Sequence, residues 1–238
     1  MTYNIHSGVG VDQRYDLGRI RRVLTEERPD IAALQELECG SPRTSLDDQS
    51  SLLAGDLSLT SSFCATRRAG EGSFGIGMLT AFPIVHQQQY DLSYGTGREP
   101  RYCLRVDLEI EPGAVLHVFN FHLGLGARER LFQRNQMVSD AILLGQELRH
   151  PVIVMGDFND RPIPVVTRTL RQHFTDAFTA AGKRWGPTFK FGPLPFRLDH
   201  IYLSAGIRVV ECRVRNDELT RVASDHRPVI ASVEVTWG

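Results

Sequence analysis

Residues 151–159 read PVIVMGDFN, in which four apolar residues precede a glycine-containing polar end. An apolar run of this length is too short for a typical helix, and the turn-forming residues around it predict a fully buried strand. A strand that is covered on both faces needs layers above and below its sheet, so the stretch predicts a layered α/β fold. Asp157 and Asn159 follow the run where the strand gives way to a loop, a position at which rigid scaffolds display functional groups.

The first half of the chain contains a similar arrangement. Residues 30–36 read DIAALQE, again a short apolar run that ends in an acid, Glu36. In both halves the run follows a strand ending in Asn-x-His and a helical stretch, which covers residues 16–28 in the first half and 127–148 in the second. The repetition predicts two similar halves packed sheet against sheet, with both sets of strand ends at one rim. A chance similarity is the alternative.

The rest of the chain has mostly the pattern of strands. A further helix is expected at 46–57, and strands are expected at 73–80, 83–91, 101–110, 114–121, 198–203, 207–214 and 228–235. No Ser/Gly-rich linker or shift in composition divides the chain, so we expect a single domain over residues 1–238.

The composition is that of an ordinary globular protein. The 238 residues carry 28 Asp+Glu and 27 Lys+Arg, a formal net charge of −1, and 42% of them are hydrophobic. Near-neutral charge argues against a protein that coats nucleic acid non-specifically. No run approaches the roughly 20 apolar residues of a membrane-spanning helix, and no charged-then-apolar leader opens the chain, so we expect a cytoplasmic protein. The four widely spaced cysteines are expected to be free, mostly buried thiols.

Polar residues at the ends of the predicted strands form the candidate site. They carry amide, imidazole and carboxylate groups: Asn4, Glu36, His122, Asp157, Asn159, Asp199, Asp225 and His226. Burying several carboxylates together is costly unless a cation or hydrogen bonds compensate. Oxygen donors of this kind favour a hard divalent ion, Mg²⁺ or Mn²⁺, which completes its shell with water and substrate phosphate. Three motifs also have structural alternatives: an Asx turn at 156–160, an interior salt bridge at 197–200 and a surface loop at 224–228.

Six motifs follow one another along the chain: Asn4, Gln35-Glu36, Asn120-x-His122, Gly156-Asp157-Phe158-Asn159, Leu198-Asp199 and Ser224-Asp225-His226. In this order they resemble the endonuclease/exonuclease/phosphatase superfamily. That group includes exonuclease III-like apurinic/apyrimidinic endonucleases, pancreatic-type deoxyribonucleases, neutral sphingomyelinases and inositol polyphosphate 5-phosphatases. The resemblance implies a four-layer α/β/β/α sandwich, with two packed mixed β-sheets flanked by helices. It also implies a divalent metal and hydrolysis of a phosphoester bond.

The same resemblance implies roles for the acids and amides. Glu36 would be the principal metal ligand, with Asn4 and Asp225 near the metal. Asp157 and Asn159 would position the attacking water or stabilise the transition state. Such a metal neutralises charge on the phosphate oxygens.

The histidines receive roles from the resemblance as well. His226, paired with Asp199, would orient or activate the nucleophile or bind the phosphate. An imidazole oriented by an acid is a tuned proton carrier near neutral pH. His122 would contact the scissile phosphate or assist the leaving group, and Arg101 would bind phosphate.

The fold does not decide the substrate. The first hypothesis is a nuclease acting on DNA or RNA, because His122 fits the diesterase members and several arginines lie near the expected rim: Arg98, Arg101, Arg128, Arg130, Arg134, Arg161 and Arg197. Aromatic residues within 185–196 would stack on bases or, alternatively, pack inward. The second hypothesis is a phosphodiesterase or phosphatase for a phospholipid headgroup, a phosphoinositide or another small phosphoester. A vestigial, non-enzymatic site is disfavoured because every expected catalytic position is filled, and we expect a monomer.

Overall fold

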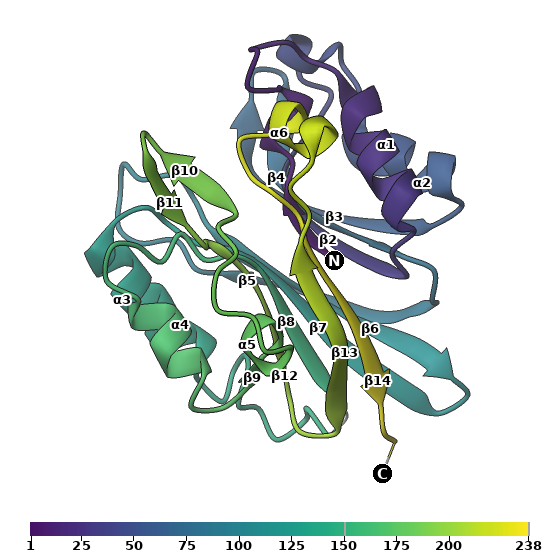
Figure 1. Ribbon diagram of the computed structural model, residues 1–238, viewed down its shortest axis with the longest axis vertical. Coiled ribbons are helices and arrows are strands. Elements are labelled where there is room, and N and C mark those ends of the chain that lie inside the picture. Colours follow the sequence, from purple (N-terminus) through teal and green to yellow (C-terminus); the bar gives the residue numbers. More distant parts are fainter. Residues whose placement is uncertain (150, 238) are drawn as a thin grey trace.

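The two apolar runs at 31–34 and 152–155 lie inside two separate sheets. The computed structural model describes residues 1–149 and 151–237, and its two six-stranded mixed sheets pack face to face with helices on both outer faces (Figure 1). The four-layer α/β/β/α sandwich implied by the resemblance is therefore confirmed. The layers cover both faces of the apolar strands, as their composition requires.

The first sheet has the strand order β13-β14-β1-β2-β4-β3, and three helices pack on its outer face. Its strands are β1 (Thr2–Asn4), β2 (Ile31–Cys39), β3 (Thr60–Ala69), β4 (Gly72–Thr80), β13 (Ile207–Val214) and β14 (Val229–Val235). The helices are α1 (Leu17–Glu27), α2 (Gln49–Leu57) and α6 (Glu218–Ala223), and the short 3-10 helices η1 (His6–Gly8) and η2 (Pro42–Thr44) follow β1 and β2. Ile20 and Leu24 lie one helical turn apart in α1 and are buried in the same cluster as Leu34 of β2.

The second sheet has the strand order β5-β6-β7-β8-β12-β9. Its strands are β5 (Ile84–Asp91), β6 (Tyr102–Glu111), β7 (Ala114–His122), β8 (Val152–Asp157), β9 (Thr175–Asp176) and β12 (Asp199–Leu203). The helices α3 (Ala127–Met137), α4 (Val165–Leu170) and α5 (Ala177–Ala180) follow β7, β8 and β9, and β10 (Phe189–Phe191) pairs with β11 (Leu194–Phe196) in a separate hairpin. Met137 and Leu170 are buried with Val154 of β8 on the outer face.

The main core lies between the sheets. Ala33 of β2 and Ile153 and Met155 of β8 belong to this inner cluster, whereas Leu34 and Val154 belong to the two outer clusters. Successive side chains of a strand point to opposite faces, so each apolar run supplies two cores at once. Because both faces of each strand are buried, both runs are apolar at every position rather than at alternate positions.

The predicted repetition between the two halves is confirmed. β1 pairs with β2 in parallel, with Asn4 opposite Gln35, and α1 connects them. β7 pairs with β8 in parallel, with His122 opposite Asp157, and α3 lies in that connection. Each half thus contains a β-α-β unit, and the carboxyl ends of its two parallel strands meet at one edge of their sheet.

Asn120 of β7 joins the two sheets through its side chain. Its amide donates to the carbonyl oxygens of Leu34 at 2.9 Å and Gly77 at 2.7 Å, both in the first sheet, and its Oδ1 accepts from Gln35 Nε2 at 2.7 Å. Asn120 is fully buried. A buried polar layer of this kind fixes the position of one sheet relative to the other, because each bond requires a particular alignment.

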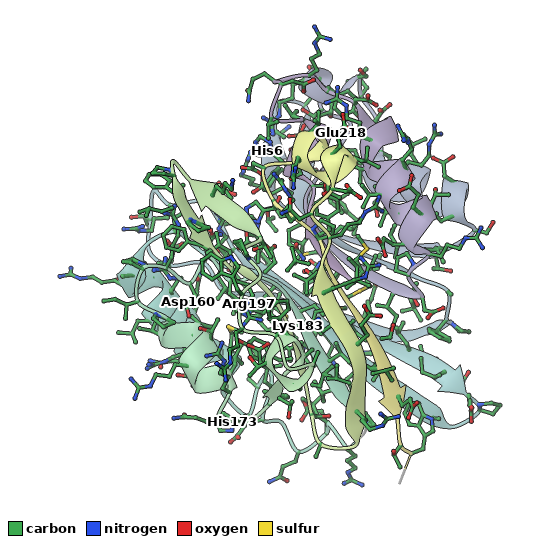
Figure 2. The ribbon with its side chains drawn as sticks, viewed as in Figure 1. His6, Asp160, His173, Lys183, Arg197 and Glu218 are labelled. Atoms are coloured by element: carbon green, nitrogen blue, oxygen red, sulfur yellow. The ribbon has the colours of Figure 1, made fainter. Side chains whose placement is uncertain are left out.

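The structure also corrects several predictions. The helix predicted at 127–148 ends at Met137, since the chain then folds into turns in which Leu143 N donates to Met137 O at 3.1 Å. Ile142 and Leu143 are buried against the second sheet, so their apolar spacing reflects packed turns rather than a helix face. The strand predicted through His6 ends at Asn4, and His6 has a positive φ of 47° in η1. Figure 2 shows His6 at the same end of the molecule as Glu218 of α6.

Other predicted elements agree with the structure to within a few residues, although β2 continues past Glu36 to Cys39, and β3, β9, the β10–β11 hairpin and α4 to α6 were not predicted individually. Among the residues that the structure describes, no helix has the length and apolarity needed to cross a bilayer. All four cysteines are free thiols, and three of them are buried: Cys64, Cys103 and Cys212.

Asp176 anchors the far edge of the second sheet. Its carboxylate accepts from Arg197 Nη2 at 2.6 Å and from Arg171 Nη2 at 3.0 Å, and it caps α5 by accepting from Phe178 N at 3.1 Å. Burial alone would raise the pKa of Asp176, but its interactions with His200 and Arg197 hold this pKa far below the usual value. The carboxylate is therefore a buried charge whose partners stabilise the ionised form.

We expect Asp176→Asn to lower the free energy of unfolding by about 3 kcal/mol at pH 7, because it removes one partner of a buried ion pair. The depressed pKa means that the stabilisation is present above the pKa of an unfolded aspartate, about 4, and is lost as the pH falls further. Urea unfolding from pH 7 to pH 3 measures this, with exposed Asp140→Asn as the control. Equal unfolding midpoints for Asp176→Asn and wild type at pH 7 would contradict the assignment.

Candidate active site

A β-bulge in β2 turns Glu36 out of the regular alternation. The register of β2 against β4 shifts between Gln35 and Leu37, and Glu36 has a φ of 60°, in the left-handed region that non-glycine residues seldom occupy. Its side chain keeps 24% of its surface exposed, while Gln35 and Leu37 on either side are buried. A bulge that redirects one acid toward a cavity is typical of a functional position.

The Asn4 amide holds two carboxylates from different sheets. Asn4 Nδ2 donates to Glu36 Oε1 at 2.8 Å and to Asp157 Oδ2 at 3.1 Å. Asn4 Oδ1 accepts from the backbone N–H of His6 at 3.0 Å, which fixes the orientation of the amide. Burial raises the pKa of both Glu36 and Asp157, against the opposing effect of the Asn4 hydrogen bonds.

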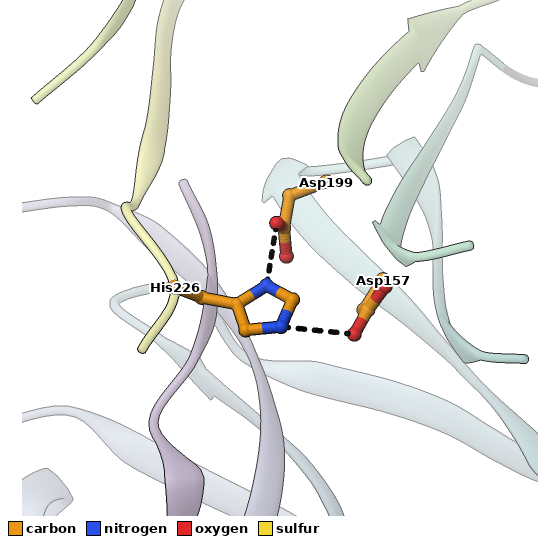
Figure 3. A group of neighbouring side chains, drawn as sticks. All are labelled: Asp157, Asp199 and His226. Atoms are coloured by element: carbon orange, nitrogen blue, oxygen red, sulfur yellow. Dashed lines mark hydrogen bonds and ion pairs between the residues drawn. The ribbon is translucent and has the colours of Figure 1, made fainter. Parts of the chain in front are cut away.

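His226 lies between Asp199 and Asp157 (Figure 3). Its Nδ1 donates to Asp199 Oδ2 at 2.8 Å, and its Nε2 lies 3.7 Å from Asp157 Oδ2. Asp199 and Asp157 are register partners on the antiparallel strands β12 and β8, so their side chains emerge together. Burial alone would lower the pKa of His226, but the two carboxylates raise it to about 10. Ligand atoms of these three residues all lie within 4.8 Å of one another, but a protonated imidazole has no free nitrogen with which to bind a metal ion.

His122 has the opposite character. Its Nε2 lies 3.9 Å from Glu36 Oε1 and 3.8 Å from Asp157 Oδ2, and Arg101 Nη1 lies 3.0 Å from its Nδ1. Burial is the main cause that holds the pKa of His122 well below 6.5, and the Arg101 charge adds to it. The site therefore holds one protonated and one neutral imidazole, and such divergence of pKa values marks different chemical roles.

Asn159 and Asp225 complete the predicted set. Asn159 N donates to Asp157 Oδ1 at 2.9 Å, and its Nδ2 donates to the carbonyl oxygen of Leu123 at 3.0 Å. Asp225 Oδ1 accepts from Ser224 Oγ at 3.4 Å and lies 4.0 Å from His6 Nδ1. Both residues line the same cavity.

The cavity has a volume of about 480 Å³, within the range of small-ligand sites, and we call it the active-site cavity. Seven of the nine predicted site residues line it: Glu36, Arg101, His122, Asp157, Asn159, Asp225 and His226. The other two, Asn4 and Asp199, lie directly behind it and are bonded to lining residues. The structure thus brings the whole predicted set together.

The surrounding arginines were predicted less well. Arg101 and Arg161 line the cavity as expected, but Arg197 binds Asp176, and the buried Arg130 lies 3.6 Å from Asp160, so these two are structural. Sequence reasoning missed two further arginines that line the cavity, Arg43 and Arg67. Arg67 lies in β3, which was not predicted individually, and Arg43 lies in η2, so the strand-end signal identified neither.

Two other expectations concern histidine and aromatic residues. His200 follows Asp199 in β12 and therefore points to the opposite face of the sheet, away from the cavity, where its ring contacts those of Phe158 and Tyr202. Phe189 and Phe191 of the hairpin line the cavity, and Phe191 is 59% exposed, so these aromatics do not simply pack inward.

Comparisons with known proteins agree with this geometry. The model of the Endonuclease/Exonuclease/phosphatase family matches residues 1–226. The chain is 29% identical to the YbhP protein of Escherichia coli strain K12, over 99% of this chain and 95% of that protein. The chain therefore belongs to the endonuclease/exonuclease/phosphatase family, whose members are hydrolytic phosphoesterases.

Solved structures share the fold. A functionally unknown conserved protein from Enterococcus faecalis superimposes with a TM-score of 0.79 at 20% identity, covering 99% of this chain and 98% of that one. A mannosyl-6-phosphatase from Bacteroides thetaiotaomicron gives a TM-score of 0.74 at 20% identity, covering 98% of both chains.

The pairing of Asp199 with His226 predicts a measurable change in titration. In metal-free protein, the imidazole NMR signals of His226 are expected to change near pH 10, because Asp199 and Asp157 stabilise its protonated form. Asp199→Asn removes one of these charges, so the transition moves to lower pH. The signals of the exposed His173 serve as the internal reference in both proteins. A His226 ring that is already neutral at pH 8 in the wild type would be incompatible with this electrostatic arrangement.

Proposed function

We propose that the protein is a Mg²⁺- or Mn²⁺-dependent phosphodiesterase that cleaves DNA or RNA by attack of water on a phosphodiester bond. The proposal rests mainly on one observation: Glu36 and Asp157, which come from different sheets, both accept a hydrogen bond from the Asn4 amide. The two site imidazoles beside these acids differ in protonation, since the pKa of His226 is raised and that of His122 is lowered. A purely structural cluster has no need for two acids whose pKa values are raised by burial.

The donor set fits a hard divalent ion. Glu36 and Asp225 offer carboxylate oxygens that face the cavity, and Asn4 lies beside Glu36 and orients it. The raised pKa values of Glu36 and Asp157 indicate that their negative charge is under-compensated by the protein alone. We assign the ion to Glu36, with Asp225 and Asn4 near it. When bound, it would neutralise charge on the phosphate oxygens and stabilise the leaving alkoxide.

The other residues act on water and phosphate. Asp157, with its raised pKa, accepts a proton from the attacking water, and Asn159 holds the loop that carries it. Protonated His226, held by Asp199, donates a hydrogen bond to a phosphate oxygen. Neutral His122 contacts the scissile phosphate as a hydrogen-bonding group, with Arg101 beside it as the phosphate-binding cation.

The lining of the cavity supports nucleic acid as the substrate. Arg161 adds positive charge, with its guanidinium 4.6 Å from the centre of the Phe191 ring, and Phe189 and Phe191 add aromatic faces. Arg43 and Arg67 also line the cavity, where they pair with Glu38 and, at 3.5 Å, with Glu99. Arginine forks suit phosphate oxygens, and aromatic faces stack on bases without strong sequence preference. This combination of cations and rings is what a chain of nucleotides requires on either side of a scissile bond.

A phosphatase or phosphodiesterase for a small phosphoester is the second candidate. The volume of the cavity, about 480 Å³, suits a ligand of nucleotide or sugar phosphate size. The structural relative from Bacteroides thetaiotaomicron is a mannosyl-6-phosphatase on the same fold, which shows that this architecture accommodates small substrates.

A substrate panel tests the proposal. Purified protein with Mg²⁺ or Mn²⁺ is expected to cleave at least one of single-stranded, duplex and abasic DNA and RNA, and excess EDTA should abolish the cleavage. Gel analysis of labelled oligonucleotides measures it. If all nucleic acids stay intact while a lipid or sugar phosphoester is hydrolysed, the second candidate replaces the first.

We expect Glu36→Gln to reduce kcat/KM by at least about 10²-fold, because the amide removes the charge that would hold the cation. The far-ultraviolet circular dichroism and the urea midpoint should stay near those of the wild type. Glu71→Gln makes the same change at an exposed position that does not line the cavity, so it is the matched control. Near-normal turnover of Glu36→Gln would refute the metal assignment.

A further inference from the structure

A second cavity adjoins the active-site cavity. It has a volume of about 490 Å³ and shares two lining residues, Phe189 and Asp225, with the active-site cavity. Three basic side chains line it, those of Lys190, Arg221 and Arg227. We call this cavity the cationic groove.

Phe189 forms the partition between the two cavities. It makes an isolated β-bridge with His226, and the centres of the two rings lie 4.8 Å apart. The next residue along, Arg227, donates its backbone N–H to the carbonyl oxygen of Thr188 at 2.7 Å. The cationic groove therefore begins one aromatic ring away from the catalytic imidazole, and the backbone itself fixes that spacing.

The arginines of the groove are held by neutral groups. Arg221 Nε donates to Asn216 Oδ1 at 2.9 Å, and Arg227 Nη1 donates to the carbonyl oxygens of Ser224 at 2.8 Å and His226 at 3.0 Å. In residues 1–149 and 151–237, neither these two side chains nor Lys190 forms an ion pair with a carboxylate. Nearby Arg215, by contrast, pairs with Glu27 at 3.2 Å and Asp217 at 2.6 Å. The groove thus carries oriented positive charge that no direct ion pair among the described residues compensates, while the Asp225 and Asp217 carboxylates act on Arg227 at longer range.

The basic residues that line the groove favour binding of an anion. Three cations that converge on one concavity repel one another unless an anion lies between them. The one acid that lines the groove, Asp225, faces both cavities and is assigned above to the metal. Arginine recognises phosphate through paired hydrogen bonds, and Lys190 adds a mobile point charge.

We propose that the cationic groove binds a second phosphate group of the substrate, one unit beyond the scissile phosphate and on the far side of Phe189. This inference rests on the proposed function, since it requires the scissile phosphate to lie in the active-site cavity. The preferred substrate is then a phosphodiester with at least one further phosphate, either along a nucleotide chain or on a small bisphosphorylated molecule.

Two chromogenic substrates that differ by a single phosphate test the proposal. They are thymidine 5′-(p-nitrophenyl phosphate) and its 3′-phosphorylated form, and the readout is the ratio of their kcat/KM values. We expect the wild type to prefer the 3′-phosphorylated form by about tenfold, as two charge-assisted contacts would give. The double variant Lys190→Gln/Arg221→Gln should bring the ratio close to one, mainly through KM.

The matched control is Lys183→Gln/Arg208→Gln, which removes the same charge from residues that line neither cavity. Figure 2 shows Lys183 in the opposite half of the molecule from Glu218, which shares α6 with Arg221. This control should keep the wild-type ratio. The proposal is overturned if the wild type has no preference, if Lys190→Gln/Arg221→Gln keeps it, or if the control loses it equally.

Binding measurements separate the groove from the proposed activity. Isothermal titration calorimetry compares thymidine 3′,5′-bisphosphate with thymidine 5′-phosphate, with Mg²⁺ present and no turnover required. If the wild type binds the bisphosphate more tightly than the monophosphate and Lys190→Gln/Arg221→Gln does not, the result supports phosphate binding in the cationic groove. This conclusion holds even if neither chromogenic substrate is hydrolysed. In that case only the proposed function fails. Competition by inositol 1,4-bisphosphate that depends on Lys190 and Arg221 indicates a small bisphosphate, and its absence indicates a nucleotide chain.

Discussion

The Asn4 amide, shared between Glu36 and Asp157, is the interaction on which the site depends. The two acids come from different sheets and are separated by more than a hundred residues, yet both accept from one nitrogen, at 2.8 and 3.1 Å. Such a contact tolerates little sliding of the sheets, because hydrogen bonds weaken steeply with distance and angle. Asn120 fixes the same alignment from the second sheet by binding Gln35 and two carbonyl oxygens of the first. The hydrogen bonds that align the two sheets therefore also set the geometry of the site.

That alignment also sets the protonation states. His226 is surrounded by acids and its pKa is raised to about 10, whereas burial, with the added effect of the Arg101 charge, holds the pKa of His122 well below 6.5. Neither imidazole owes its state to its own strand alone, since Asp199, Asp157 and Arg101 belong to three different strands or their ends. One fold thus produces two chemically distinct histidines within 4 Å of the same carboxylate, that of Asp157.

Much of the fold and of the candidate site was readable from the sequence, because a buried strand leaves a continuous apolar run and its polar end marks the rim. The apolar run at 152–155 correctly placed Asp157 at the end of β8, but Glu36 lies inside β2, which continues to Cys39, and not at its end as predicted. The sequence does not predict the bulge at Glu36, because a local shift in register depends on how β2 pairs with β4. Arg43 and Arg67 reach the cavity from η2 and β3 and pair there with Glu38 and Glu99, and Arg130 is buried beside Asp160. Only tertiary contacts therefore reveal which acid each arginine meets.

The β10–β11 hairpin pairs with neither main sheet, yet its Phe189 touches His226 and its Phe191 faces solvent. The buried acids and their amide are built from other elements entirely. Exchanging residues 190–196 would therefore reshape the entrance of the cavity while Phe189 keeps its β-bridge and its ring contact with His226. For protein engineers, that makes these seven residues the replaceable part of the hairpin.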